Sequence, residues 1–549
     1  MSSIVLIAIS LSIFFFGYNI YSKKFEKLFK IDPARKTPAF SKYDGIDYVP
    51  AKHWTMLFGH HFASIAGAAP IIGPVLALSI WGWAPSVIWI LLGTVFIGGI
   101  HDYAALIISV KHGGTSIADI AKDSISKNAK IVFLAFLWLA LILVISVFAN
   151  ICARTFIVKP EIVVPSLSLI PIAVFVGILL YYMKMRQSMA TVIGLGLFAG
   201  AMILGKYIPI ELGANAMQIW TVFLLAYAFI ASITPVNILL QPRDYLASYL
   251  LVIGVILGYA GIIISRPEIT FPAFIGWGKS EGLMLWPILF VTVACGAVSG
   301  FHSVVASGTT SKQIANEKDA RKIGYGAMVA EGIIAIMAVL VVAAAFKDKN
   351  VLREIVDRGA GPVGAFGIGY SEVTKRFMGS FGGIFAIMIL NSFILTTLDT
   401  ATRITRYLTQ ELFGIKNRIA ATLIVVALAG WLGLNGQWNE IWPMFGAANQ
   451  LIAALALIVI SSWLLSRRKA LLYTLVPMVF MLFTATTALV LKIIEYSKSG
   501  SAVLLVVAIV LLGLACFVIF EAVLAIRRIM SVRRNLFGAK GKHTKKGRR

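Results

Sequence analysis

Three histidines stand inside strongly apolar stretches of this 549-residue chain, and they are the residues best suited to carry chemistry. His60 and His61 lie in "HHFASIAGAAPIIGP", and His302 lies in "GFHSVVASGTTSKQ". Imidazole changes its charge near neutral pH, so each histidine is a candidate proton carrier or a hydrogen-bond donor to a substrate. The alternative is that each histidine is a hydrogen-bonded packing residue. Metal binding is not expected, because no nearby carboxylate or cysteine has ligand spacing.

Both histidine stretches also contain small residues that can interrupt a helix. Non-helical backbone is tolerated in a membrane only where it is buried in protein or lines a polar cavity. The free N–H groups at the start of a half-helix suit an anion such as a carboxylate. We therefore predict breaks at Ala66–Ala69 and Ser307–Thr310; the alternative is that the glycines only permit close helix packing. The predicted substrate site consists of His60, His61, Ser64, Ala66, Gly67, Ala68, Ala69, His302, Ser303, Ser307, Gly308 and Thr309.

Two aspartates inside apolar runs are candidate ion-coupling residues, because an acid within a membrane span is costly and functional by default. Asp102 follows a histidine, and Asp399 lies in "TTLDTATR". Asp399 and Arg403 are four residues apart and share a helix face, so an internal ion pair is the alternative to a proton or sodium site. The predicted ion-coupling residues are Asp102, Asp399, Thr396, Thr397 and Thr400.

A third group of polar residues is expected to act in gating or in structure. In "QPRDYL", Arg243 and Asp244 open a helix after a predicted cytoplasmic turn, where they either cap the turn or form a gate. Glu331 is a candidate relay in the middle of a span. The amides of Asn449 and Gln450 need partners in hydrocarbon, and we favour a role in joining helices over a role in lining the pathway. The full group is Arg154, Arg243, Asp244, Glu331, Arg403, Asn449 and Gln450.

The composition identifies the elements that must position these residues. Hydrophobic residues make up 59% of the chain and charged residues 13%, about half of the charged share of soluble domains. Runs of ~20 apolar residues, enough to cross a bilayer as helices, recur throughout. We predict an all-α polytopic membrane protein with about 15 spans. These lie near 3–22, 54–80, 86–110, 131–157, 164–183, 189–207, 217–239, 243–264, 284–310, 324–346, 381–407, 418–434, 440–466, 470–493 and 502–526.

The positive charge of the chain fits this topology. Lys and Arg number 49 against 24 Asp and Glu, a net charge of +25. The cations fall in alternate short loops, as expected for cytoplasmic loops beside anionic headgroups, so the bilayer rather than nucleic acid is the expected partner. We predict that the N-terminus lies outside and that the C-terminus is a disordered basic tail in the cytoplasm. The opening segment is expected to be a retained helix rather than a removed signal peptide.

The two histidine stretches also predict an internal repeat. "HFASIAG" (61–67) and "HSVVASG" (302–308) align without a gap, and the predicted topology orients them oppositely. Corresponding broken segments of opposite orientation are typical of inverted-repeat secondary transporters. We predict a terminal helix and basic loop (1–50), a first repeat (51–210), two accessory helices with an outer loop (211–280), a second repeat (281–466), two further helices (467–530) and a basic tail (531–549).

Three longer strings resemble a known family. "DYVPAKHWTMLFGHHFASIAGAAPIIGPVLA", "QPRDYL" and "GFHSVVASGTTSKQ" are similar to motifs of the carbon starvation protein (CstA) family of inner-membrane carriers, and the resemblance runs from about residue 45 to about residue 466. It implies a LeuT-like five-plus-five inverted repeat of the amino acid–polyamine–organocation type, with additional helices. It also implies uptake of peptides or of small carboxylates such as pyruvate, driven by protons.

Residues and resemblance together predict a secondary active transporter. We expect it to import a small carboxylate or short peptides across the inner membrane by proton symport with alternating access. The alternatives are a sodium-coupled carrier of similar substrates, and a channel or membrane sensor on the same scaffold. No catalytic motif or cofactor site is expected, and the chain lacks the pattern G-x-x-x-x-G-K-[ST] that binds nucleotide phosphates.

Overall fold

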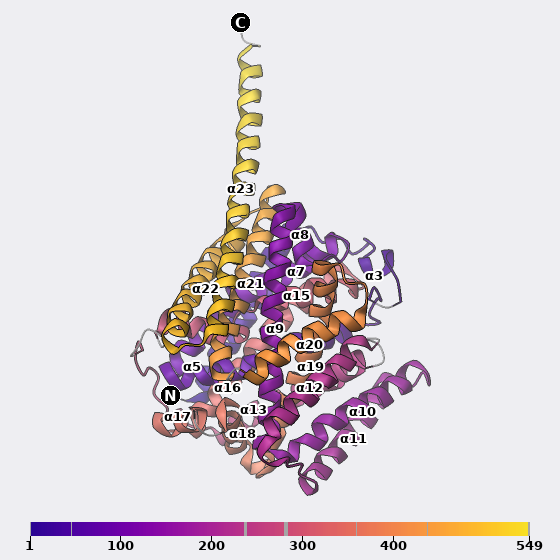
Figure 1. Ribbon diagram of the computed structural model, residues 1–549, viewed down its shortest axis with the longest axis vertical. Coiled ribbons are helices and arrows are strands. Elements are labelled where there is room, and N and C mark those ends of the chain that lie inside the picture. Colours follow the sequence, from indigo (N-terminus) through magenta and orange to yellow (C-terminus); the bar gives the residue numbers. More distant parts are fainter. Residues whose placement is uncertain are drawn as a thin grey trace.

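The computed structural model describes residues 2–45, 47–234, 239–278, 284–357, 360–435 and 438–546, which form a helical bundle (Figure 1). Thirteen helices in these ranges are long and apolar enough to cross a membrane. The pair Trp54–Ala66 and Ala69–Trp81, bent by 40°, makes a fourteenth, and the shorter apolar helix Arg418–Leu434 falls where a fifteenth span is predicted. The expectation of about 15 spans is met on this count.

The helices follow the predicted spans closely along most of the chain. The longer ones are α1 (Ser3–Phe16), α4 (Trp54–Ala66), α5 (Ala69–Trp81), α6 (Trp83–Gly93), α7 (Gly99–Lys111), α9 (Lys127–Val158), α10 (Val163–Tyr181), α11 (Gln187–Tyr207), α12 (Ala216–Ile233), α13 (Leu240–Ser265), α16 (Ala320–Ala345), α18 (Gly361–Met378), α19 (Phe381–Phe413), α20 (Arg418–Asn435), α21 (Trp438–Ser466), α22 (Leu472–Ser499) and α23 (Ala502–Lys546). The shorter ones are α2 (Ser22–Glu26), α3 (Pro38–Ser41), α8 (Ile117–Ser124), α14 (Phe290–Val293), α15 (Gly300–Gly308) and α17 (Lys349–Asp357).

The interior of the bundle includes the long helices α9, α16, α19 and α21. The most apolar stretch of α21, within Ile441–Ser466, is buried throughout, and α9, α16 and α19 are mostly buried. A helix that is hydrophobic all round must lie either inside a large protein or against lipid. Here α9, α16, α19 and α21 take the interior, whereas α10 and α11 form a hairpin at one edge of the bundle (Figure 1). The residues that join the interior helices are therefore the place to look for a site.

The segment 347–380, which the hydropathy pattern leaves as a loop, contains two helices, α17 and α18. α17 is short and polar, and α18 is interrupted by glycines, so neither contains an apolar run of membrane length. α18 nevertheless packs against α13, α16 and α19. This segment is thus part of the packed bundle rather than a simple connection.

The last helix, α23, projects well beyond the rest of the bundle (Figure 1). The sequence predicts that the last span ends near residue 526 and that a disordered tail follows. That prediction is wrong for the backbone, because α23 continues as one helix to Lys546.

Candidate functional site

The first predicted break is confirmed. α4 ends at Ala66 and α5 begins at Ala69. Between them Gly67 has a φ of 50°, a conformation that costs little only for a residue without a Cβ. A Cβ at Gly67 would also lie 2.9 Å from Thr397 Oγ1 on α19. The glycine is therefore required both by the turn and by the close approach of α19.

The predicted stretch Ser307–Thr310 contains the end of α15 at Gly308 and the start of a 3-10 helix at Thr310, but not the break within the span. That interruption lies at 294–299, between α14 and α15, so the predicted position is wrong. The aligned histidine strings lie on opposite sides of their breaks, since α4 precedes its break whereas α15 follows its own. Gly308 has open space where a Cβ would stand, so it serves neither a turn nor close packing.

The second break is held by the side chain of Asn449 on α21. The backbone N–H of Phe301 donates to Asn449 Oδ1 (2.9 Å), and Asn449 Nδ2 donates to Ser299 Oγ (3.0 Å). Gln450 Nε2 donates to the carbonyl of Phe290 on α14. These bonds supply partners for backbone groups that the interrupted helix frees, which hydrocarbon could not do. The expectation that the two amides join helices is confirmed.

A small cavity lies between the two breaks, and we call it the central cavity. Its empty volume is about 220 Å³, part of which is open to solvent. The lining is apolar except for one hydroxyl and one thiol. Its residues are Ile65, Ala66, Ala69, Val144, Phe148, Cys295, Phe301, Thr397 and Phe445.

Only Ala66, Ala69 and Thr397 of the predicted site residues line the central cavity. Several of the others are engaged elsewhere. The hydroxyls of Ser64, Ser303 and Thr309 donate to carbonyls of their own helices. Ser307 Oγ accepts a hydrogen bond from the N–H of Ile117 (3.0 Å) and so anchors the start of α8. His61 Nδ1 lies 2.8 Å from Thr310 Oγ1 and links α4 to the turn after α15.

A first buried polar network is centred on Arg243, and we call it the arginine network. Arg243 donates to Asp399 and Tyr227, and its Nη2 donates to Asp244 Oδ1 (3.0 Å). Tyr227 donates to Asp399 Oδ2 (2.7 Å), and His60 Nδ1 lies 3.1 Å from Asp244 Oδ2. These five residues join α4, α12, α13 and α19.

The geometry of the arginine network confirms one expectation and corrects another. Arg243 and Asp244 lie in the first turn of α13, as predicted for residues that open a helix, and the predicted contact between them is present. Arg243 is 1% exposed. Asp399 does not pair with Arg403 on its own helix. Arg403 instead donates to the carbonyls of Ala231 (2.9 Å) and Thr234 at the end of α12.

A second buried polar network surrounds Asp102, and we call it the histidine network. His101 Nδ1 lies 2.7 Å from Asp102 Oδ1, and His302 Nδ1 lies 2.7 Å from Asp102 Oδ2. His302 Nε2 is 3.2 Å from Glu331 Oε2. All four side chains are fully buried between α7, α15 and α16, and within the described ranges no lysine or arginine forms an ion pair with either carboxylate.

The histidine network needs an added proton to satisfy its contacts. A neutral His302 that donates from Nδ1 to Asp102 presents a lone pair at Nε2 to the carboxyl of Glu331. That contact becomes attractive only if the ring is an imidazolium or if Glu331 carries the proton. The arrangement can therefore hold and exchange a proton.

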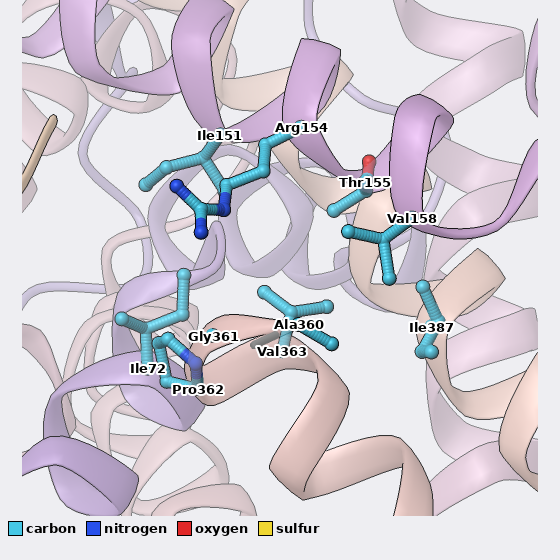
Figure 2. Close-up of a pocket in the computed structure, with 10 residues that line it drawn as sticks. All are labelled: Ile72, Ile151, Arg154, Thr155, Val158, Ala360, Gly361, Pro362, Val363 and Ile387. Atoms are coloured by element: carbon cyan, nitrogen blue, oxygen red, sulfur yellow. The ribbon is translucent and has the colours of Figure 1, made fainter. Parts of the chain in front are cut away.

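A second cavity, of about 380 Å³, lies beside Arg154, and we call it the Arg154 cavity (Figure 2). Figure 2 shows the guanidinium of Arg154 pointing into the cavity toward Ile72 and Gly361. The cavity is lined by residues of α5, α9, α19 and the first turn of α18. These residues are Ile72, Ile151, Arg154, Thr155, Val158, Ala360, Gly361, Pro362, Val363 and Ile387.

Comparison with known sequences decides the family. The family described as "Carbon starvation protein CstA" matches residues 2–355 and 347–488 of this chain. The chain belongs to the carbon starvation protein CstA family.

Curated relatives of this CstA-family protein carry transporter names. It is 32% identical to the "Pyruvate/proton symporter BtsT" of Escherichia coli (strain K12), over 90% of this chain and 82% of the relative. It is 33% identical to the "Peptide transporter CstA" of the same organism, over 80% of this chain and 74% of the relative.

The fold of this CstA-family protein is LeuT-like. A solved structure of the Eremococcus coleocola manganese transporter, in complex with an aromatic bis-isothiourea substituted compound, is similar at a TM-score of 0.50 and 12% sequence identity. A mutant structure of the same transporter reaches 0.51 at 13% identity and covers 88% of this chain and 97% of its own. At such identities the likeness concerns the fold alone.

Several residues of the CstA-family site were not predicted from the sequence. Tyr227 completes the arginine network, and Phe148 and Phe445 line the central cavity. Each is an aromatic residue in an apolar run, where most aromatics are core or interface residues, so nothing marked these three. The first turn of α18 belongs to a helix that the hydropathy pattern missed.

Proposed function

We propose that this CstA-family protein is a secondary active transporter that imports a small monocarboxylate such as pyruvate by proton symport with alternating access. Short peptides are the second candidate substrate, supported by the names of several relatives. The observation that carries the proposal is the pair of helix breaks that flank the central cavity, together with the buried histidine network, whose His302 lies on α15 one residue after Phe301 of the cavity wall.

The central cavity is small in this structure and would have to widen for either substrate, less for a small monocarboxylate than for a peptide. Free N–H groups near a helix break would receive a carboxylate, and the aromatic wall would pack against its hydrocarbon part.

Charge balance in the histidine network supports coupling to protons. The network has two carboxylates, Asp102 and Glu331, and no arginine or lysine paired with them among the described residues. Its net charge reaches zero only when two protons are added to the neutral imidazoles and ionised carboxylates. Uncompensated buried charge is strongly unfavourable, so exposing the network to water on one side and closing it on the other would release and capture protons.

A sodium-coupled carrier is the alternative, and one observation favours it. Within the part of the chain that the structure describes, the buried hydroxyls of Thr397 and Thr400 have no hydrogen-bond partner beside the first break. Hydroxyl oxygens of this kind could ligate a cation. Against this, Arg243 already supplies a positive charge to Asp399.

The arrangement of the chain in the membrane completes the proposal. Residues 51–210 and 281–466 would form the two inverted repeats, and the helices of 1–50, 211–280 and 467–530 would surround them. The tail 531–549 would lie in the cytoplasm and the N-terminus outside, in the inner membrane, following the cation-rich loops.

Reconstitution of the full chain into liposomes tests the function. We expect saturable uptake of labelled pyruvate, counterflow of labelled substrate, and stimulation by an inward proton gradient but not by a sodium gradient. A labelled dipeptide measured in parallel decides between the two substrate classes. Uptake that follows sodium and ignores pH would refute proton coupling, and linear uptake without counterflow would indicate a channel.

A further inference from the structure

We propose that residues 47–53 form a lid over the path from the central cavity to the side predicted to be cytoplasmic, and that Lys312 holds this lid closed between Tyr48 and Tyr407. We call residues 47–53 the lid segment. The inference deepens the proposed function and rests on it for the direction in which the substrate leaves. It assigns a role to a segment that lies outside the membrane spans.

Three helices lead from the central cavity to the lid segment. α4 contributes Ala66 to the cavity, α15 contributes Phe301 and α19 contributes Thr397. The lid segment precedes the start of α4, Lys312 follows the end of α15, and Tyr407 lies ten residues beyond Thr397 on α19. At 1.5 Å per residue this last interval spans ~15 Å. The contacts of the lid segment are therefore made at the predicted cytoplasmic ends of helices that line the cavity.

The side chain of Lys312 joins the lid segment to α19. Its Nζ lies 5.4 Å from the ring centroid of Tyr48 and 5.8 Å from the ring centroid of Tyr407. Both distances are within the ~6 Å over which a cation is attracted to the face of an aromatic ring. The hydroxyl of Tyr407 also donates to Asp47 Oδ1 (3.2 Å), and the N–H of Ala51 donates to the carbonyl of the residue after Lys312 (2.9 Å). The lid segment thus bridges α19 and the turn that follows α15.

The segment before the lid is held more firmly than the lid itself. Glu317 is 1% exposed. Its carboxylate lies 3.2 Å from Arg35 Nη1 and 3.1 Å from Lys111 Nζ, and it accepts the N–H of Asp32 (3.2 Å). Hydrogen bonds between ionised groups are stronger than cation–π contacts of half-buried side chains. We therefore expect the lid segment to open while residues 32–35, which we call the anchor, stay in place.

Buried polar groups on α4 and α19 mark the path that the lid would open. His61 lies one turn of α4 before Ile65 of the cavity wall. Thr397, Thr400 and Tyr407 are three and seven residues apart and share one face of α19. Among the described residues, His61 Nε2 and the hydroxyls of Thr397 and Thr400 are buried without a hydrogen-bond partner. Because buried polar groups are normally hydrogen-bonded, these groups would meet water or substrate when the lid is open.

A labelling experiment tests the lid without relying on transport. Thr400 is 3% exposed, so Thr400→Cys places a protected thiol on the path. The full chain with this change, and with the exposed Cys516 replaced by serine, is purified in detergent and treated with a charged methanethiosulfonate. The same chain without Thr400→Cys corrects for the buried Cys152 and Cys295.

We expect Lys312→Met to raise the labelling rate of Thr400→Cys by about tenfold, because it removes both cation–π contacts and keeps a long side chain. Tyr407→Leu should act in the same direction. Lys318→Met, which changes a nearby exposed lysine, is the matched control and should leave the rate unchanged. Unchanged labelling in both Lys312→Met and Tyr407→Leu would overturn the proposal. An equal rise in the chain that lacks Thr400→Cys would overturn it too, because it would show general loosening.

Cross-linking separates this inference from the proposed function. A short bifunctional methanethiosulfonate that joins Asp47→Cys to Tyr407→Cys should abolish uptake, and reduction should restore it. In the anchor, Asn316 Nδ2 donates to the carbonyl of Pro33 (3.1 Å), so the same reagent can join Pro33→Cys to Asn316→Cys. That cross-link should leave uptake unchanged.

Each outcome of the cross-linking experiment bears on one of the two claims. Uptake that persists when the lid segment is cross-linked to α19 would refute the lid alone. Wild-type protein that imports neither pyruvate nor dipeptides would refute the proposed function, and the labelling rates would still decide whether Lys312 holds the lid closed.

Discussion

The arginine network and the histidine network are alike in burial and composition but differ in the source of their positive charge. Each contains two carboxylates, and each lies beside a residue that lines the central cavity, Thr397 for the first and Phe301 for the second. The first has a guanidinium, which keeps its proton at all physiological pH values. The second has only imidazoles. The arginine network thus keeps one fixed positive charge, with the imidazole of His60 beside Asp244 as a further contact, whereas every positive charge of the histidine network has to come from a proton.

The largest effect on stability should come from removing the guanidinium of the arginine network. Arg243→Gln would leave Asp244 and Asp399 buried without their fixed counter-charge, which costs about 3–5 kcal/mol when a buried pair loses one partner. We expect a large fall in folded yield and in the melting temperature of the detergent-purified protein. The double variant Arg243→Gln with Asp399→Asn removes opposite charges together and should recover part of the loss. If Arg243→Gln alone is as stable as wild type, the arginine network does not hold the helices together.

The next largest effect should come from removing the shared proton. His302→Gln loses the contacts to Asp102 and Glu331, and a hydrogen bond to a charged group contributes about 1.5–3 kcal/mol, or roughly 10–100-fold. We expect uptake driven by a pH gradient to fall by that factor, while folded yield falls less than in Arg243→Gln. His112→Gln, at the end of α7 and outside both networks, is the matched control. If uptake by His302→Gln keeps the pH dependence of wild type, the histidine network does not take part in proton coupling.

A smaller effect should separate the two carboxylates of the histidine network. Glu331→Gln leaves Asp102 as the only carboxylate, so one proton rather than two balances the network. We expect uptake to persist with a shallower dependence on the imposed pH gradient, by a few-fold at most. The measurement is the initial rate at several external pH values and constant internal pH. A slope equal to that of wild type would show that Glu331 does not take part in coupling.

The smallest expected effect is on stability, and it concerns Gly67 and Gly308, the two glycines that occupy equivalent positions in the aligned histidine strings. Gly67→Ala would force alanine to a φ of 50° and a ψ of −151°, which only glycine adopts readily, and against Thr397, at a cost of about 1–3 kcal/mol. Gly308→Ala meets open space and should change stability by no more than about 0.5 kcal/mol. Melting temperatures of the two variants, measured side by side, test this asymmetry. Equal destabilisation would contradict the assignment of the second break to 294–299.

Most of the fold could be predicted from hydropathy and charge, because membrane helices must be long, apolar and internally hydrogen-bonded. The first break was also predictable, since Gly67 and two prolines interrupt one apolar run. The second break was misplaced because we expected the two similar histidine strings, 61–67 and 302–308, to have the same backbone conformation. The interruption at 294–299 contains small residues without proline, and Asn449, which holds it, lies far along the chain.

The partners of the buried charges could not be predicted, because they depend on contacts between distant helices. Asp399 was expected near a cation, and the sequence offered Arg403 one turn away. The structure instead brings Arg243 from α13 and Tyr227 from α12. In the same way, Asp102 and His302 were singled out separately, but no local pattern indicated that they are hydrogen-bonded to each other. The spacing of residues along one helix predicts contacts within that helix and not contacts with other helices.

The amide of Asn449 has a mechanical consequence. It fastens the start of α15 to α21 through the N–H of Phe301, whereas α5, which begins at Ala69, has no side-chain cap. Any movement that preserves the bonds of Asn449 carries the start of α15 together with α21. A change of angle between α4 and α5 must instead strain the contacts that His60 and His61 of α4 make with Asp244 and Thr310. The second break is therefore held at its own ends, whereas the first is held from the neighbouring helices.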